Sequence, residues 1–209
     1  MSIDYITSID TIIFDPEYNS PLNPELLANY KKIIFSDYKL EYELFEAYKN
    51  DNFENLELVN SKFNQPLSNA LNNCTALTHI YFGCDFSQPL LNSLDNCSEL
   101  THITFGWDFD QPLLNSLDNC TRLTHIKFCS KFNQPLANSL NNCTALTHID
   151  FGSSFNQPLG NSLDNCTALS ILVFNYYFNK PLGNSLDNCT ALTHIKFGHY
   201  FNQPLCNSL

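Results

Sequence analysis

Histidine recurs at one position of the sequence, and imidazole is a side chain that both binds metal ions and responds to pH. The five residues are His79, His102, His125, His148 and His194, with Ile171 at the remaining place in the series. Neighbouring imidazoles could share an ion, and their charge changes near physiological pH. No carboxylate or thiol recurs beside them. We therefore predict no metal site and interpret the rings as packed surface histidines, with pH-dependent binding as an intermediate alternative.

Nine cysteines form the second group of reactive side chains, and most of them share one repeat position. Those at the shared position are Cys74, Cys97, Cys120, Cys143, Cys166 and Cys189. The N-terminus lacks the basic start and apolar run of a secretory signal peptide, so we expect reduced, buried thiols in an intracellular, cytoplasmic protein. The Asn-Cys-Thr and Asn-Cys-Ser sequences also match the glycosylation acceptor pattern, which we interpret as incidental to a structural asparagine.

The composition argues against several other functions. No nucleophile, base and orienting residue cluster outside the repeated positions, so we predict that the chain is not an enzyme and takes no cofactor. Its net charge is -11, from 21 acidic and 10 basic residues, and no basic residues cluster. Because nucleic acids and anionic membranes are bound mainly through phosphate neutralisation, we predict neither as a partner. No apolar stretch approaches the length of a membrane span.

The elements that position these side chains are repeats of 23 residues. The phenylalanines that mark the period are Phe63, Phe86, Phe109, Phe132, Phe155, Phe178 and Phe201. A fixed period in this range indicates a solenoid. Within each repeat, Thr-His-Ile-x-Phe alternates with period two and predicts a short strand, with Ile80 and Phe82 inward and His79 and Tyr81 outward. Pro89 suits the turn to the opposite side, where we expect one helical or 3-10 turn.

The repeats divide the chain into two parts. Residues 1–62 resemble divergent copies that form an N-terminal cap, with strand-like stretches at 12–14, 33–35 and 56–58 and a helix near 40–49. Residues 63–209 form the regular repeats, and the last repeat is incomplete at Leu209. We expect its open end to be frayed, truncated or covered by another subunit, which makes a homodimer through this end one alternative.

The repeat resembles a known family of leucine-rich repeats. Leu-x-x-Ile-x-Phe matches the strand of a leucine-rich repeat. The continuation Phe-Gly-x-x-Phe-Asn-Gln-Pro-Leu, as in residues 151–159, resembles the FNIP (FGxxFN) class known from amoebae and large DNA viruses. The Asn-Cys-Thr tail is similar instead to cysteine-bearing repeats of bacterial surface proteins. These resemblances imply an α/β solenoid: a curved right-handed coil with a parallel sheet on its concave face, a phenylalanine spine, and few short helical or 3-10 turns on its convex face.

Specificity must come from the positions that vary between repeats. These are the outward strand residue and the two loop positions that follow the strand. Our candidate partner-binding residues are Tyr81, Trp107, Lys127, Asp150, Ile171, Val173, Tyr176, Tyr177, Lys196, His199 and Tyr200. Exposed aromatic residues are typical of interface hot spots, and they concentrate in the last two repeats. We therefore predict a non-enzymatic scaffold that binds a protein partner.

Two alternatives to this scaffold function remain open. The first is a structural protein that self-associates through its uncapped C-terminal repeat. The second is the substrate-recognition module of a ubiquitin ligase, because some relatives of the FNIP class carry an F-box ahead of their repeats. Residues 1–60 contain no convincing F-box, so the resemblance in this respect is incomplete.

Overall fold

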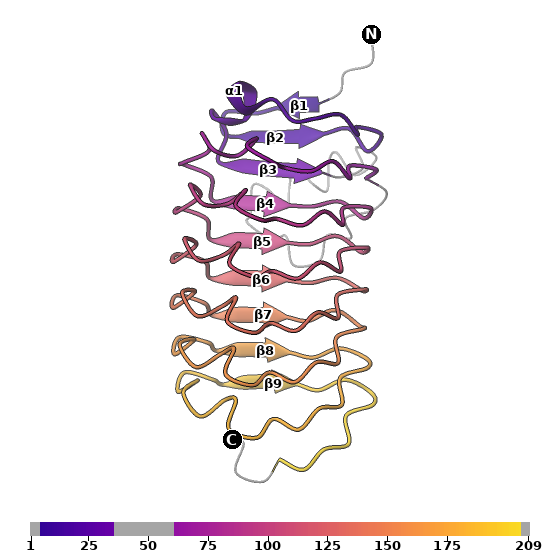
Figure 1. The fold of residues 1–209 in the computed structure, drawn as a ribbon, viewed down its shortest axis with the longest axis vertical. Helices are drawn as coiled ribbons and strands as arrows, with labels where there is room; N and C mark the ends of the chain where they lie inside the picture. Colours follow the sequence, from indigo (N-terminus) through magenta and orange to yellow (C-terminus); the bar gives the residue numbers. More distant parts are fainter. Residues whose placement is uncertain (1–4, 36–60, 206–209) are drawn as a thin grey trace.

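The computed structural model describes residues 5–35 and 61–205, and within them the chain forms one nine-stranded sheet (Figure 1). The strands follow the order of the sequence, so each pairs with the next along the long axis. They are β1 (Tyr5–Thr7), β2 (Thr11–Phe14), β3 (Lys32–Phe35), β4 (His79–Tyr81), β5 (His102–Thr104), β6 (His125–Lys127), β7 (His148–Asp150), β8 (Ile171–Val173) and β9 (His194–Lys196). From β2 onward all pairs are parallel, which confirms the predicted solenoid with a parallel sheet.

The register repeats the sequence period. His79 pairs with His102, and Ile80 with Ile103, so residues at one repeat position lie beside each other on successive strands. We call the 23 residues that lead from one such position to the next a coil. Ile80 and Phe82 are fully buried and His79 is half-buried, as the period-two alternation predicts.

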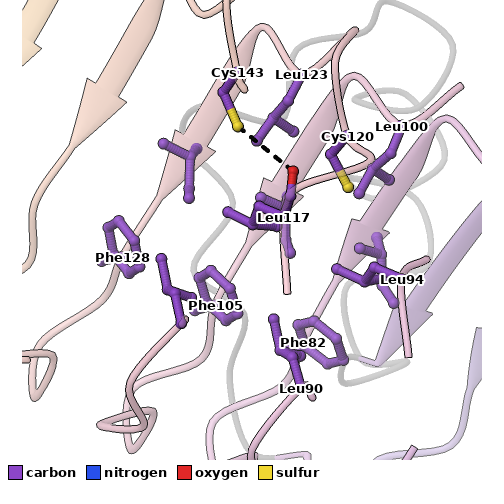
Figure 2. Close-up of a cluster of buried hydrophobic side chains, with 14 of the residues drawn as sticks. Phe82, Leu90, Leu94, Leu100, Phe105, Leu117, Cys120, Leu123, Phe128 and Cys143 are labelled. Atoms are coloured by element: carbon purple, nitrogen blue, oxygen red, sulfur yellow. Dashed lines mark hydrogen bonds between the residues drawn. The ribbon is translucent and has the colours of Figure 1, made fainter. Parts of the chain in front are cut away.

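The core is built around two parallel columns of phenylalanine rings. Within one coil, Phe82 and Phe86 stack with ring centroids 4.1 Å apart. Between coils, Phe82 lies 5.8 Å from Phe105, and Phe86 lies 6.1 Å from Phe109. One ring column lies along a row of leucines in Figure 2. A single coil leaves both flat sides of these rings exposed, so neighbouring coils must stack to bury them.

The predicted thiols line the same core. All six cysteines at the shared position are buried and reduced. The Cys143 thiol donates to the Leu117 carbonyl at 3.9 Å (Figure 2), and Cys166 makes the same contact with Leu140. Burial raises the pKa of Cys143 to about 12 and that of Cys189 to about 11.

The side opposite the sheet is made of consecutive turns. In one coil the Ser93 N–H donates to the Leu90 carbonyl, Asp95 to Asn92, and Cys97 to Leu94, so each turn closes over three residues. Across residues 61–205 this side carries hydrogen-bonded turns, where we had expected a helical or 3-10 turn. The chain therefore crosses the side opposite the sheet through consecutive turns.

An asparagine ladder joins the coils beside the second phenylalanine column. The Asn133 side-chain carbonyl accepts a hydrogen bond from the Asn156 N–H at 2.9 Å and another from Gln157 Nε2 at 3.2 Å. Asp110 supplies the same acceptor one coil earlier. Asn19 already does so for Asn64, so the ladder reaches the first parallel coil. The ladder therefore links a side chain of one coil to the backbone of the next.

The N-terminal part continues the same sheet, which confirms strands at 12–14 and 33–35. β3 pairs directly with β4, and the strand-like stretch expected at 56–58 lies outside the described residues. Phe35 stacks on Phe63 at 4.2 Å, as Phe82 does on Phe86, so the paired rings of the regular coils continue into the N-terminal part. The helix expected near 40–49 lies outside the described residues.

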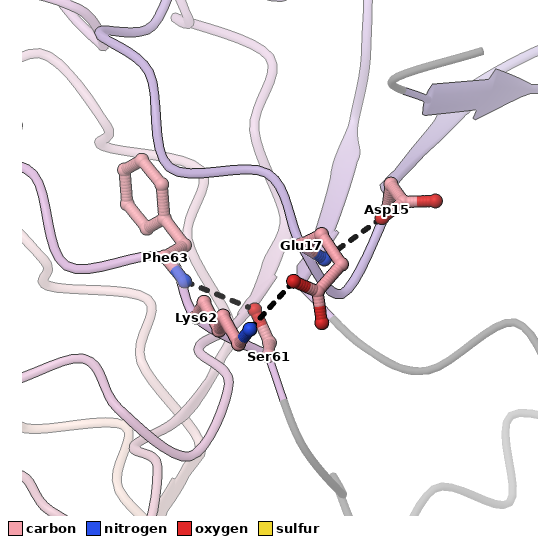
Figure 3. A network of polar contacts seen from close by, with 5 residues as sticks. All are labelled: Asp15, Glu17, Ser61, Lys62 and Phe63. Atoms are coloured by element: carbon pink, nitrogen blue, oxygen red, sulfur yellow. Dashed lines mark hydrogen bonds and ion pairs between the residues drawn. The ribbon is translucent and has the colours of Figure 1, made fainter. Parts of the chain in front are cut away.

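The first coil has its own closing features. β1 pairs antiparallel with β2 and so ends the parallel stack. The four-residue helix α1 (Pro24–Leu27) begins after Asn23, whose side chain accepts from the Glu25 and Leu26 N–H groups. Lys62 forms an ion pair with Glu17 at 2.6 Å, which links the chain at residue 62 to this first coil (Figure 3).

Candidate functional site

The loops that follow the strands are held in register by the backbone. The Asp108 N–H donates to the Cys84 carbonyl at 2.8 Å, and the Tyr177 N–H donates to the Ser153 carbonyl at 3.0 Å. The coils approach closely here, since a Cβ on Gly106 would lie 1.7 Å from the Gly83 oxygen. Glycine lets the backbones of Gly83 and Gly106 approach this closely. The variable loop side chains stand on a rigid frame.

The histidine column is confirmed as a stack of rings on the solvent side of the sheet. Successive centroids from His79 to His148 are 4.3, 4.3 and 4.2 Å apart. Each Nδ1 lies 2.8–2.9 Å from the hydroxyl of the preceding threonine, as in Thr101 and His102. That hydroxyl donates its hydrogen to a carbonyl of the previous coil, so Nδ1 carries the ring hydrogen.

This stacking does not favour a shared metal ion. The lone pairs of an imidazole lie in the ring plane, and planes that are nearly parallel direct them side by side instead of toward one point. Within residues 5–35 and 61–205, no three histidine, cysteine, aspartate or glutamate side chains gather as a metal site would need. Ile171 occupies the gap between His148 and His194 in the register.

The neighbouring outward column contains the varying strand residues. Tyr81 is only 4% exposed, so our prediction that it presents its side chain to a partner is wrong. Lys127, Asp150 and Val173 follow in register, each partly exposed, and Lys196 is exposed.

Asp150 is the partly buried acidic residue of this column. Burial raises the pKa of its carboxyl group, whereas Lys127, the hydrogen bond from Asn175 and Lys196 all act to lower it. The Asn175 side chain donates to Asp150 Oδ1 at 2.8 Å and also to the Phe151 carbonyl. Asn175 replaces the usual glycine, so its amide occupies the loop and fixes the carboxylate of the preceding coil.

Four predicted site residues form one aromatic cluster: Tyr176, Tyr177, His199 and Tyr200. Tyr177 and Tyr200 stack with centroids 5.6 Å apart, and Tyr176 stacks on His199 at 5.4 Å. The two stacks meet edge to face, with Tyr176 at 84° to Tyr177. The tyrosine side chains remain 45%, 50% and 51% exposed.

Charge and hydrogen bonding couple two phenols of the aromatic cluster. The charge of Tyr200 and the hydrogen bond between the two hydroxyl groups raise the pKa of Tyr176. The Tyr176 phenol therefore remains protonated at neutral pH and can donate a hydrogen bond.

Trp107 lies apart from this cluster. It occupies the same loop position three coils earlier and is 57% exposed. Beside it, Lys131 and Asp108 form an ion pair at 2.8 Å. The predicted set is therefore not one contiguous site but an isolated tryptophan, a strand column and the aromatic cluster.

Sequence reasoning missed one group of exposed apolar residues on the turn side. Leu91 and Leu114 are 64% and 63% exposed, and both have a φ of 49° in the left-handed region. Gly160 and Gly183 occupy the same position in later coils. The change from glycine to leucine along this position was visible in the sequence and is the signal that could have identified it.

Comparison with known proteins decides the family. The model of the BspA type leucine rich repeat region matches in six copies, over residues 27–137 and 113–203. The chain belongs to the BspA-type leucine-rich repeat family. This agrees with the similarity of the Asn-Cys-Thr tail to cysteine-bearing bacterial repeats, whereas membership of the FNIP class stays a prediction. A comparison with curated protein sequences finds no match.

Solved structures show the same fold for this BspA-type chain. It is similar to CroV588, described as a novel circular LRR protein, with a TM-score of 0.56 and 24% identity over 97% of this chain and 32% of that one. Internalin F of Listeria monocytogenes is similar with a TM-score of 0.59 and 18% identity, over 96% of this chain and 58% of that one. Internalin C2 of the same organism is similar with a TM-score of 0.56 and 12% identity, over 90% of this chain and 80% of that one. The chain thus spans about a third of the length of CroV588.

The family sets the general kind of function. Leucine-rich repeat proteins commonly serve as scaffolds for protein interaction and are typically not enzymes, because their stacked coils form long surfaces rather than enclosed pockets. In the part of the BspA-type chain that the structure describes, no helix combines the length and apolarity needed to cross a bilayer.

Proposed function

We propose that this BspA-type chain is a non-enzymatic scaffold that binds a protein partner through the outward strand positions and the adjoining loops of its later coils. The aromatic cluster is the centre of this surface. Around it we place Ile171, Val173 and Lys196 on the strands. Lys127, Asp150 and Trp107 form the periphery toward the N-terminal coils.

The observation that carries the proposal is the exposure of the aromatic cluster. Three tyrosines in two adjacent loops keep about half of their surface in water, although a folded chain gains by burying such rings. Their loops are fixed between coils by hydrogen bonds such as Tyr200 N–H to the Tyr176 carbonyl, 3.1 Å. A partner therefore meets rings that are already ordered, which lowers the entropic cost of binding.

The test compares proteins retained by the native chain with those retained by Tyr176→Ala/Tyr177→Ala. We expect the double variant to lose at least one specifically retained protein, because hot-spot tyrosines typically contribute about 2 kcal/mol or more. Leu114→Ala is the matched control, since Leu114 is exposed on the opposite side. Circular dichroism verifies that both variants are folded. Equal retention by all three proteins would place the binding surface elsewhere.

A second candidate function is assembly through the last described coil. Leu192, Ile195, Phe197 and Phe201 are only partly buried there, whereas the same positions in earlier coils are fully buried. A second copy stacked on this face would cover those side chains and continue both phenylalanine columns. Sedimentation velocity over a range of concentrations tests this, and a sedimentation coefficient that stays monomeric throughout contradicts it.

We also propose a reducing, cytoplasmic location for the chain, supported by its buried thiols. Sequestered cysteines with raised pKa values react slowly and suit a protein that carries no disulfide among its described residues. Fractionation of the native cell with an antibody tests the location. Recovery of the chain outside the cytoplasm would refute it.

A further inference from the structure

Charge is segregated across the later coils, although the chain as a whole is acidic. Between residues 123 and 205 the basic residues are Lys127, Lys131, Lys180 and Lys196, and the acidic residues are Asp150, Asp164 and Asp187. Asp164 and Asp187 lie in the turns on the back. The strand and loop side therefore keeps Asp150 as its one acidic residue in this range, and that carboxylate is already engaged by Asn175.

The basic groups next to the aromatic cluster are available to a partner. Lys196 is exposed on β9, between His194 on the same strand and His199 in the loop that follows. The ion pairs found in the described part of the chain involve Lys62, Arg122 and Lys131, so Lys196 belongs to none of them. The phenol groups of Tyr176 and Tyr200 add hydrogen-bond donors within the same two coils.

We infer that this surface binds an acidic, extended segment of a protein, with carboxylates on Lys196, the histidines and the tyrosine hydroxyls and with apolar side chains against the tyrosine rings. The inference rests on the proposed scaffold function and names its partner class. Two coils span about 10 Å, which three residues of an extended chain cover. Carboxylates accept strongly from ammonium and phenol donors, and charge complementarity supplies the preference over neutral segments.

A nucleic acid fits this surface less well. Basic and aromatic side chains also bind single strands, but such binding follows a backbone that carries one charge per nucleotide. The chain has a net charge of -11, and its acidic turns lie on the same coils. A short protein segment needs to bring only a few carboxylates to the basic side. The oligonucleotide is therefore a comparison in the test.

The experiment measures fluorescence anisotropy of labelled twelve-residue peptides with the full chain. The acidic peptide repeats Glu-Leu-Glu-Tyr, and matched peptides replace each glutamate with glutamine or lysine. We expect the acidic peptide to bind about tenfold or more tightly than the glutamine peptide at low salt, with the ratio falling as salt is added. A twelve-nucleotide oligo-deoxythymidine is the fourth probe. Tighter binding of the oligonucleotide, or equal binding of acidic and glutamine peptides, overturns the inference.

Variants locate the binding. Lys196→Gln/His199→Gln should remove most of the preference for the acidic peptide, and Tyr177→Ala/Tyr200→Ala should weaken the acidic and glutamine peptides alike. Leu91→Ala and Arg122→Gln are controls, because they change an exposed apolar and an exposed basic residue outside the proposed surface. Controls that lose as much affinity as the site variants overturn the assignment.

The test separates the two proposals. If the acidic and glutamine peptides bind equally well and the tyrosine variant weakens both, the scaffold surface stands and the acidic preference fails. If no peptide binds and Tyr176→Ala/Tyr177→Ala retains every cellular protein that the native chain retains, the scaffold proposal itself fails.

Discussion

At the scale of single residues, Asp150 is a carboxylate that the fold tolerates at a cost. Burial is the main cause of its raised pKa, so the protonated form is favoured more in the folded chain than in the unfolded chain. A raised carboxyl pKa means that stability is lost as pH rises from the unfolded value, about 3.9, through the folded value. Asp150→Asn keeps an oxygen that can accept from Asn175. We therefore expect this variant to be more stable than the native chain at neutral pH.

The measurement is urea unfolding at several pH values. The stability difference between Asp150→Asn and the native chain should grow as pH rises from about 4 and then become constant. Asp95→Asn is the control, since Asp95 is exposed in a turn and Asn72 and Asn141 already occupy the same position in other coils. A difference for Asp150→Asn that is negative at neutral pH would show that its attraction to Lys127 and Lys196 outweighs burial.

Leu114 is a second residue at which local physics disfavours the amino acid present. A β-carbon at a φ of 49° costs about 1–2 kcal/mol, and the exposed side chain recovers little of this by burial. Leu114→Gly should stabilise the chain by about 0.5–1 kcal/mol after the higher entropy of unfolded glycine is counted. Leu114→Ala retains the unfavourable φ and should be nearly neutral. Thermal unfolding of both variants tests this, and equal melting temperatures would contradict it.

At the scale of elements, the asparagine ladder holds neighbouring coils at fixed spacing. Asn133→Ala removes the acceptor of the Asn156 N–H and one of the two acceptors of Gln157 Nε2, which keeps the Asn133 backbone carbonyl. Donors left without a partner cost about 1–3 kcal/mol, so we expect a loss of this size in urea unfolding. Asn133→Asp keeps the acceptor that Asp110 already provides in the preceding coil and should lose much less. Equal losses of stability in the two variants would mean that the accepting side-chain oxygen does not stabilise the ladder.

The strands and core columns could be predicted because each repeat confirms the others. A period-two pattern that recurs without slippage specifies both the inward residues and the register, as the pairing of Ile80 with Ile103 shows. Tyr81 was misassigned because alternation gives the side of the sheet on which a side chain lies but not how far that side chain is buried.

The candidate site was predicted less completely than the fold. Variable positions directed the prediction to the loops of the last two coils, where the structure joins Tyr176, Tyr177, His199 and Tyr200 in one cluster. Their pairing across coils follows from the period. The contact from Asn175 to Asp150 was beyond the sequence, because it depends on how the Asn175 side chain is placed at a turn where four other coils carry glycine.

At the scale of the whole molecule, the column of buried thiols makes the free energy of unfolding fall with rising pH in the alkaline range. Burial raises the pKa of Cys97 and Cys166 to about 12 and that of Cys74 to about 11, while an unfolded chain releases these protons near 8.5. For a thiol the raised value means that stability is lost as pH rises through the unfolded pKa toward the folded one. Each such thiol contributes a fall of about 1.4 kcal/mol per pH unit within that window.

The chain should therefore unfold between about pH 9 and 11, with a slope that counts the protected thiols. Cys143→Ala/Cys166→Ala should reduce the slope by about 2.7 kcal/mol per pH unit. Urea unfolding under anaerobic conditions with reductant measures the slope, and the comparison cancels every group that both proteins share. Leu140→Ala, a core change without loss of a thiol, should lower stability at every pH and leave the slope unchanged. An unchanged slope in the cysteine variant would mean that the coils already separate, and expose the column, before the molecule unfolds.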